Sequence, residues 1–251
     1  MEKLTHYPVL VFALAFVSLA LASMAGALVR KRYPGVSDEQ KDDLSVILGA
    51  TLTLLALIIG FSFSMATNRY DQRKNFEEAE ANAIGTELLR ADLIAAADAA
   101  NARRLLGEYL DQRIRFYINK DDTQRARIDQ RTAQLQADLW GAVRGPAASQ
   151  ATPVAALVLA GMNDVINSQG YTQAAYWNRI PVAAWCLMAA IAVCSNLLFG
   201  YRSQNAGKLA LALPLVVSIS FLLIADIDAP RHGLIEVRPQ NLESLAASLG
   251  R

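Results

Sequence analysis

Two aspartates separated by one residue, Asp226 and Asp228, are the side chains in this sequence that most clearly suggest chemistry. They end an uncharged apolar run, where a carboxylate opposes the negative end of the helix dipole and therefore needs a partner. That partner could be a basic group, a bound cation or water. A structural ion pair or a solvated helix end is the ordinary interpretation, and a metal site or proton relay is the alternative.

Other catalytic motifs are missing from the sequence. His6 and His232 lie near opposite ends of the chain, and each is interpreted as a solvated residue rather than a ligand. There is no paired-histidine metal spacing, no glycine-rich phosphate loop and no nucleophile elbow. We therefore expect no enzyme activity, no metal and no cofactor. A membrane enzyme or transporter built around the two aspartates stays open as an alternative.

A stripe of residues at helical spacing follows the segment 53–78. At ~100° per residue these positions fall within one sector about 100° wide. Its members are Thr53, Leu57, Phe61, Ser64, Asn68, Asp71, Gln72 and Asn75, with Glu78 roughly 20° outside it. Ordinary helix packing is one explanation of such a stripe. The other is a pore lining, in which apolar rings gate by dewetting and carboxylates favour cations.

Membrane-spanning helices are the elements that would position these residues. About 20 apolar residues cover the ~30 Å hydrocarbon core. Four uncharged runs qualify, namely Pro8 to Val29, the run that begins at Leu44, Ile180 to Tyr201, and Leu209 to Ala225. The last run is the shortest and contains Pro214, but its leucines and valines outweigh one kink.

The first run could instead be a signal peptide. Its apolar stretch exceeds the roughly 7 to 15 residues of a signal-peptide core. Three basic residues, Arg30, Lys31 and Arg32, follow it directly and suggest a stop at a membrane face. A membrane span is therefore the preferred interpretation.

The second run continues into a charged segment without a turn residue. Nothing between Leu44 and Glu80 terminates a helix except the tolerable Gly49 and Gly60, and no proline intervenes. We predict one unbroken helix to about Glu80. Four small residues on it would let neighbouring helices approach closely, namely Gly49, Gly60, Ser62 and Ala66.

The segment between the two pairs of spans is predicted to be helical, because its apolar residues follow helical spacing. Asp121 and Asp122 are typical of a helix start, and the segment from Gly145 to Pro153 is the clearest loop. The predicted organisation is all-α, with a first transmembrane pair (1–67), a helical extramembrane domain (68–178), a second transmembrane pair (179–226) and a C-terminal tail (227–251).

Composition and charge agree with a membrane protein. The chain is 53% hydrophobic and 19% charged with a net charge of +1, which argues against nucleic acid as a partner. The basic residues near the span ends number six on one side and seven on the other. This balance leaves the orientation open.

Three stretches resemble the bacterial bestrophin-like domain family of four-span membrane proteins. They read GATLTLLALIIGFSFSMATNRYDQRKNFEEAEANAIGTELLRADL, MNDVIN before NRIP, and DIDAPRHGLIEV. This chain carries Asn167 and Thr172 where family members often carry an aspartate and a downstream arginine. An ion pair formed there in relatives is therefore in doubt here.

A weaker resemblance connects the chain to true bestrophins, which are pentameric ion channels. Gly60-Phe61, seven residues, then Arg69-Tyr70 is similar to a bestrophin pattern at the same helix end, and Asp228-Ala229-Pro230 is similar to an acidic-proline element. The resemblance implies a pore lined by the second span, with a neck at Thr53, Leu57 and Phe61. Thr53 departs from the apolar neck pattern.

The resemblance also implies a location and excludes one feature. In calcium-gated bestrophins an acidic cluster follows the acidic-proline element, but here it continues Arg231-His232-Gly233-Leu234, so we expect no calcium clasp. Both termini and the helical domain would be cytoplasmic in a multi-pass protein of the bacterial inner membrane.

The sequence therefore favours a homo-oligomeric channel for inorganic ions in the lipid bilayer. The alternative is a non-conducting membrane scaffold whose helical domain binds a cytoplasmic partner.

Overall fold

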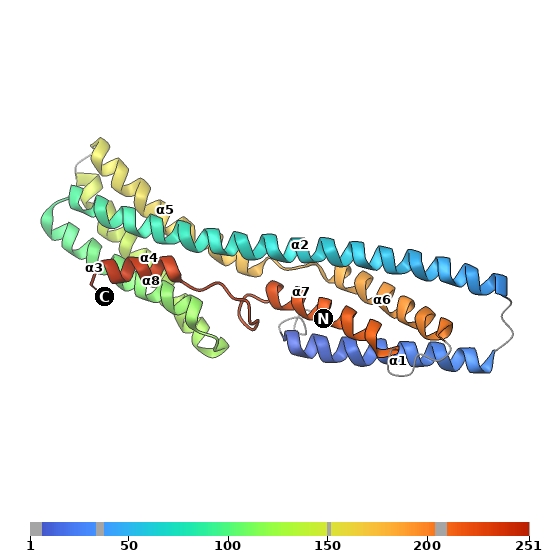
Figure 1. Cartoon of the computed structure of the whole chain (residues 1–251). Coiled ribbons are helices and arrows are strands. Elements are labelled where there is room, and N and C mark those ends of the chain that lie inside the picture. The colour runs from blue at the N-terminus through green and yellow to red at the C-terminus, as the bar shows by residue number, and fades with distance from the viewer. Residues whose placement is uncertain (1–6, 34–37, 150–151, 204–209, 251) are drawn as a thin grey trace. The chain divides into compact units, whose positions relative to one another are not determined.

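The computed structural model describes residues 7–33, 38–149, 152–203 and 210–250, and the regular structure within them is helical. The all-α prediction is therefore confirmed. In chain order the elements are α1 (Pro8–Arg32), α2 (Asp38–Arg90), the 3₁₀ helix η2 (Ala91–Leu93), α3 (Ala96–Ile118), α4 (Asp122–Ser149), α5 (Pro153–Trp177), α6 (Val182–Arg202), α7 (Ala212–Asp228) and α8 (Gln240–Ser248) (Figure 1).

The chain forms two compact units, and α2 contributes to both. One unit, here called the membrane unit, comprises Met1–Tyr70 and Arg179–Glu236. The other, here called the helical unit, comprises Asp71–Asn178 and Val237–Arg251. The segment after residue 226, predicted as one tail, is thus divided between the two units.

The α2 helix runs without interruption for 53 residues, which confirms the predicted continuity beyond Glu80. At about 1.5 Å per residue it is roughly 80 Å long. The apolar half and the charged half join within one hydrogen-bond ladder because neither proline nor a turn sequence separates them. Gly49 and Gly60 lie inside the helix and do not break it.

Three segments of the described chain are long and apolar enough to cross a membrane. They are Pro8–Arg32, Asp42–Leu93 and Pro153–Arg202. The chain is therefore a multi-pass membrane protein. The fourth predicted run corresponds to α7, which has 17 residues, and its first residue, Leu209, lies outside the described residues.

Close packing in the membrane unit occurs where α1 crosses α6. A Cβ added to Gly26 would overlap the Leu197 carbonyl oxygen, and one added to Gly200 would overlap the Ser23 carbonyl oxygen. Glycine at both positions therefore lets the two backbones touch, as small residues commonly do between membrane helices. At the end of α6, Arg30 Nη1 donates hydrogen bonds to the carbonyl oxygens of Tyr201 and Arg202, at 3.0 and 2.7 Å.

The glycines of α2 make no close helix contact within the single chain. Within the described chain no atom lies within 4 Å of a Cβ built on Gly49 or Gly60, so neither mediates a close helix contact here. Gly60 instead borders a cavity that residues of α2 and α7 line together. Ser62 and Ala66, the other two small residues, are buried within the chain.

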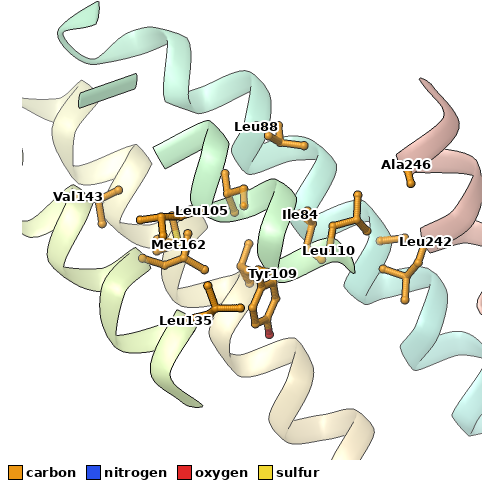
Figure 2. Packing of buried hydrophobic residues seen from close by; sticks show 14 of the residues in the cluster. Ile84, Leu88, Leu105, Tyr109, Leu110, Leu135, Val143, Met162, Leu242 and Ala246 are labelled. Carbon is orange, nitrogen blue, oxygen red and sulfur yellow. The ribbon is translucent and has the colours of Figure 1, made fainter. Parts of the chain in front are cut away.

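The helical unit has its own apolar core, drawn from α2, α3, α4, α5 and α8 (Figure 2). Asp121 caps α4 as predicted, since its Oδ1 accepts the Thr123 N–H at 2.8 Å. The predicted loop at Gly145 was wrong in its first part, because α4 continues to Ser149. Pro146 removes one backbone donor in the final turn, and the helix ends soon after it. Residues 150–151 of that loop lie outside the described residues.

Candidate pore-lining face and its supports

The predicted stripe forms one exposed face of α2. We call it the α2 stripe. All of its members are exposed in the single chain, namely Thr53, Leu57, Phe61, Ser64, Asn68, Asp71, Gln72, Asn75 and Glu78. Leu57 and Phe61 are 53% and 62% exposed, so these two large apolar side chains are not covered by the chain itself. The structure therefore brings these residues onto a common face without covering them.

The opposite face of α2 is buried in both units. In the membrane unit, Leu55 and Ala66 belong to the apolar core. In the helical unit, Glu77, Glu80 and Ile84 are buried. These positions lie about half a turn away from the stripe. The chain therefore uses one face of α2 for its own packing and leaves the other free.

The second span is also the least covered of the three apolar segments. Only 6% of its most apolar window is buried within the chain, compared with 28% for Pro8–Arg32 and for Pro153–Arg202. In the membrane unit α1 packs on both α6 and α7. The α2 helix adds Leu55 and Ala66 to this core, with Ile58, Ile59 and Tyr70 packed against it.

The Thr53 hydroxyl has a partner within its own helix. Its Oγ1 donates to the Gly49 carbonyl oxygen at 2.9 Å. This hydrogen bond turns the hydroxyl proton toward the backbone, so Thr53 is less polar toward its surroundings than a free hydroxyl would be.

Asp228 is a buried carboxylate that ties three segments of the membrane unit together. Its Oδ1 lies 3.5 Å from Arg69 Nη1, and its Oδ2 lies 3.8 Å from Arg179 Nε. Both carboxylate oxygens accept the Ile180 N–H at 3.2 Å, just before α6 begins. The end of α7 is thereby joined to α2 and to the start of α6. Of the partners considered for this acid, the structure supplies a basic one.

Asp226 instead stabilises the turn that follows α7. Its Oδ1 accepts the Leu234 N–H at 2.7 Å, and its Oδ2 accepts the Ile235 N–H at 2.9 Å. Gly233 is required in this turn, because a Cβ there would overlap the Asp226 carbonyl oxygen. Pro230 lies in the same turn. Among the described residues, no group of three or more histidine, cysteine or acidic side chains is arranged to hold a metal ion.

Of the other motif residues on α2, Arg69 and Tyr70 contact the interior of the membrane unit and Gly60 does not. Arg69 is largely buried beside Asp228, and Tyr70 packs against the apolar core of the membrane unit. Gly60 lies next to the stripe and is exposed. Arg73, on the far side of the helix from the stripe, is buried.

Sequence reasoning missed the buried carboxylates of the helical unit. Glu80 and Arg113 form an ion pair in which both side chains are fully buried. Tyr117 Oη and Thr172 Oγ1 donate to Glu80 Oε2, at 3.2 and 3.3 Å. Thr172, at the position where relatives often carry arginine, therefore contacts this same acid, and Arg113 supplies the positive charge.

Glu77 acts as a helix cap supplied from a distant part of the chain. Its Oε1 accepts the N–H groups of Asn241 and Leu242 at 3.0 Å, in the first turn of α8. The residue before α8 is Pro239, whose side chain provides no cap. A carboxylate at this position satisfies open backbone donors and suits the positive end of the helix. The helical spacing of these acids could have indicated this from the sequence, since Glu77 and Glu80 share one face of the helix with the apolar Ile84.

Glu87 is a third buried acid on α2, and it has few partners. Arg90 Nη1 lies 3.9 Å from its Oε2, and neither carboxylate oxygen accepts a hydrogen bond. Burial raises the pKa of Glu87 from 4.5 to about 7, against the lowering effect of Arg90, and nearby Asp164 raises the pKa further. Gly161 makes room for this group, because a Cβ there would overlap Glu87 Oε2.

Long apolar helices, one of them shared with a second helical unit, define an all-α multi-pass membrane protein. The chain belongs to the bestrophin-like family, since the model of the bestrophin-like domain matches residues 14–242.

Solved structures of bacterial origin share this fold. A crystal structure of a bestrophin homolog from Klebsiella pneumoniae, carrying a point mutation, has a TM-score of 0.62 at 13% identity and covers 94% of this chain and 98% of its own. A second variant of that homolog has a TM-score of 0.61 at 16% identity and covers 93% and 98%. A comparison with curated proteins finds no match.

We predict that Asp228→Asn destabilises the protein by about 3 kcal/mol, because it removes the carboxylate charge beside the largely buried guanidinium groups of Arg69 and Arg179. The thermal unfolding midpoint of the purified protein in detergent measures the effect. Asp71→Asn is the matched control, since Asp71 is exposed and should change the midpoint little. Equal midpoints for the two variants would contradict the role assigned to Asp228.

Proposed function

We propose that this chain forms a homo-oligomeric ion channel whose pore is lined by the α2 stripe. One observation carries the proposal. The stripe is continuous along α2, includes polar side chains where the helix is otherwise apolar, and is uncovered in the single chain.

Lipid is a poor environment for this face. Ser64 and Asn68 are exposed near the end of the apolar half of α2, and polar groups without partners are costly to place in hydrocarbon. Asp71 and Gln72 extend the same face. Water or another copy of the chain would satisfy these groups. A face that begins apolar and becomes polar suits a pore with a dry neck and a wet vestibule.

A single subunit does not provide an aqueous path between its own spans in this proposal, because its four proposed spans carry no charged residue that would favour water there. A ring of several copies, with α2 at its centre, would enclose an aqueous path between the subunits. Bestrophins, which the sequence resembles, are pentamers, and we propose the same number here. In this arrangement α7, at 17 residues, is the fourth span, which is within the range of roughly 17 to 25 residues that crosses a bilayer.

We propose a neck at Thr53, Leu57 and Phe61. Rings of large apolar side chains can exclude water from a narrow passage and so gate conduction without charge. The hydrogen bond from Thr53 to the Gly49 carbonyl supports including Thr53, because it lessens the polarity of that ring.

The vestibule beyond the neck favours cations in this proposal. Asp71 and Glu78 are exposed on or beside the stripe, and rings of carboxylates attract cations. Two nearby arginines are turned away from the stripe, because Arg69 is paired with Asp228 and Arg73 is buried. The helical unit and both termini are proposed to be cytoplasmic, in a bacterial inner membrane.

The decisive experiment combines oligomeric state with ion flux. We expect the detergent-purified protein to be a pentamer by native mass spectrometry, and to release K⁺ from liposomes. A monomer both in mild detergent and in native membranes would exclude the channel. A stable ring that passes neither cations nor anions would favour the scaffold.

Variants of the neck test the position of the barrier. Leu57→Ala together with Phe61→Ala should widen and wet the passage and raise the flux, whereas Thr53→Leu should lengthen the dry barrier and lower it. Liposome flux of variants with verified oligomeric state gives the measurement. Phe63→Ala is a control, because Phe63 is exposed on α2 but lies about 120° from the centre of the stripe. Unchanged flux in the double variant would place the barrier elsewhere.

Charge neutralisation tests the vestibule. Asp71→Asn with Glu78→Gln should reduce the preference for cations without closing the pore, because it removes two carboxylate rings. The reversal potential in asymmetric KCl measures this preference. Lys74→Gln, an exposed change outside the stripe, controls for charge in general. If the reversal potential of the double variant matched the wild type, the stripe would not line the vestibule.

A further inference from the structure

A basic cleft lies at the α3–α4 hairpin of the helical unit, away from the α2 stripe in sequence and formed by different helices. Its volume is about 660 Å³. It is lined by Gln112, Arg115, Ile118, Asn119, Gln124, Arg127, Ile128 and Arg131. A cleft of this size lies within the range of roughly 300 to 1,000 Å³ that small-molecule sites occupy.

The lining of the cleft is basic. Arg115, Arg127 and Arg131 all line it, and none of the described residues that line it is acidic. Arg115 and Arg127 are exposed, and among the described residues neither forms an ion pair. Two guanidinium groups facing a cleft without a carboxylate leave their donors available to an anion.

Neighbouring arginines show that this is not the general condition of the hairpin. Arg103 pairs with Asp92, and Arg104 pairs with Glu108. Arg125, on the same helix as Arg127, pairs with Asp129 at 3.6 Å. Arg115 and Arg127 differ from these three arginines, because neither has an acidic partner among the described residues.

The third arginine is held in place by the protein. Arg131 Nη2 donates to Glu108 Oε2 at 2.9 Å, and its Nη1 donates to Gln134 Oε1 at 3.2 Å. Its position is therefore fixed, while part of its charge is offset by Glu108. Arg131 serves to shape the wall, and Arg115 and Arg127 supply most of the free charge.

The hairpin that forms the cleft is ordered by its own hydrogen bonds. Gln112, which is buried, donates from Nε2 to the Ile128 carbonyl oxygen at 3.1 Å and so joins α3 to α4. Asn119 Nδ2 donates to Gln124 Oε1 at 2.8 Å across the connection. A preformed cleft binds a ligand without first ordering its walls.

The apolar part of the lining adds a second requirement. Ile118 is 57% exposed and Ile128 is buried at the cleft wall. A ligand that places a phosphate between the arginines and an apolar or flat group against Ile118 would use both parts of the lining. Inorganic ions such as chloride would use only the first part.

We propose that this cleft binds a small phosphate ester, with its phosphate held by Arg115 and Arg127. Arginine suits this group because its planar donors match phosphate oxygens in pairs. The site is independent of whether the chain conducts ions. A soluble phosphate ester and a lipid headgroup share this chemistry, so the experiment includes both.

The test is calorimetric titration of the full-length protein in detergent at low salt. AMP represents a soluble phosphate ester, dihexanoyl phosphatidic acid represents a lipid headgroup, and adenosine is the uncharged control. We expect a phosphate probe to bind and adenosine not to bind. Arg115→Gln and Arg127→Gln should each weaken binding about tenfold, because each removes a charge-assisted contact.

A matched variant separates a site from general attraction to positive charge. Arg144→Gln removes an exposed charge from α4, the helix that carries Arg127, but outside the cleft. It should leave the affinity for the phosphate probes unchanged. Binding of AMP alone or of the lipid alone, lost in the cleft variants, supports the proposal and identifies the source of the phosphate. Absence of binding by both probes, or equal affinity in the wild type and the two cleft variants, overturns it.

Discussion

The unbroken backbone ladder of α2 is the constraint on which the rest of the structure depends. Because 53 residues share one helix, the side chains in its apolar and charged halves keep a common angular register. The buried face in one half therefore continues as the buried face in the other, from Leu55 to Ile84. The residues on the opposite side of the helix keep the same register and form the exposed α2 stripe. A kink in the middle would break both faces at once.

Much of this could be predicted from the sequence, because the signals were local. The lack of proline between Leu44 and Glu80 predicted the long helix, and the angular positions of the polar residues predicted a common face. Helical spacing is a property of neighbouring residues, so it requires no knowledge of tertiary contacts. By the same spacing Arg73 is about half a turn from the centre of the stripe, and its side chain is buried.

The remainder depended on contacts between distant residues, which a single sequence does not record. Arg69 and Asp228 are 159 positions apart, and Glu77 and Leu242 are 165 positions apart. Sequence chemistry indicated that Asp228 needed a partner at a helix end, but it could not select one. The close crossing of α1 and α6 was missed for a similar reason. Gly26 and Gly200 are inconspicuous in the sequence until the two backbones are seen to touch.

The helical unit is unusual in how it satisfies its interior charges, and Glu87 is the extreme case. Glu80 has Arg113, Tyr117 and Thr172, and Glu77 has the first turn of α8, but Glu87 has only a distant Arg90. With a pKa near 7 in place of 4.5, Glu87 keeps its proton in the folded unit over a pH range in which the unfolded chain has released it. Folding of this unit therefore takes up a proton between about pH 4.5 and 7, and its stability falls as the pH rises through that interval. Mild acidification therefore stabilises the helical unit through a carboxyl group that lies off the α2 stripe.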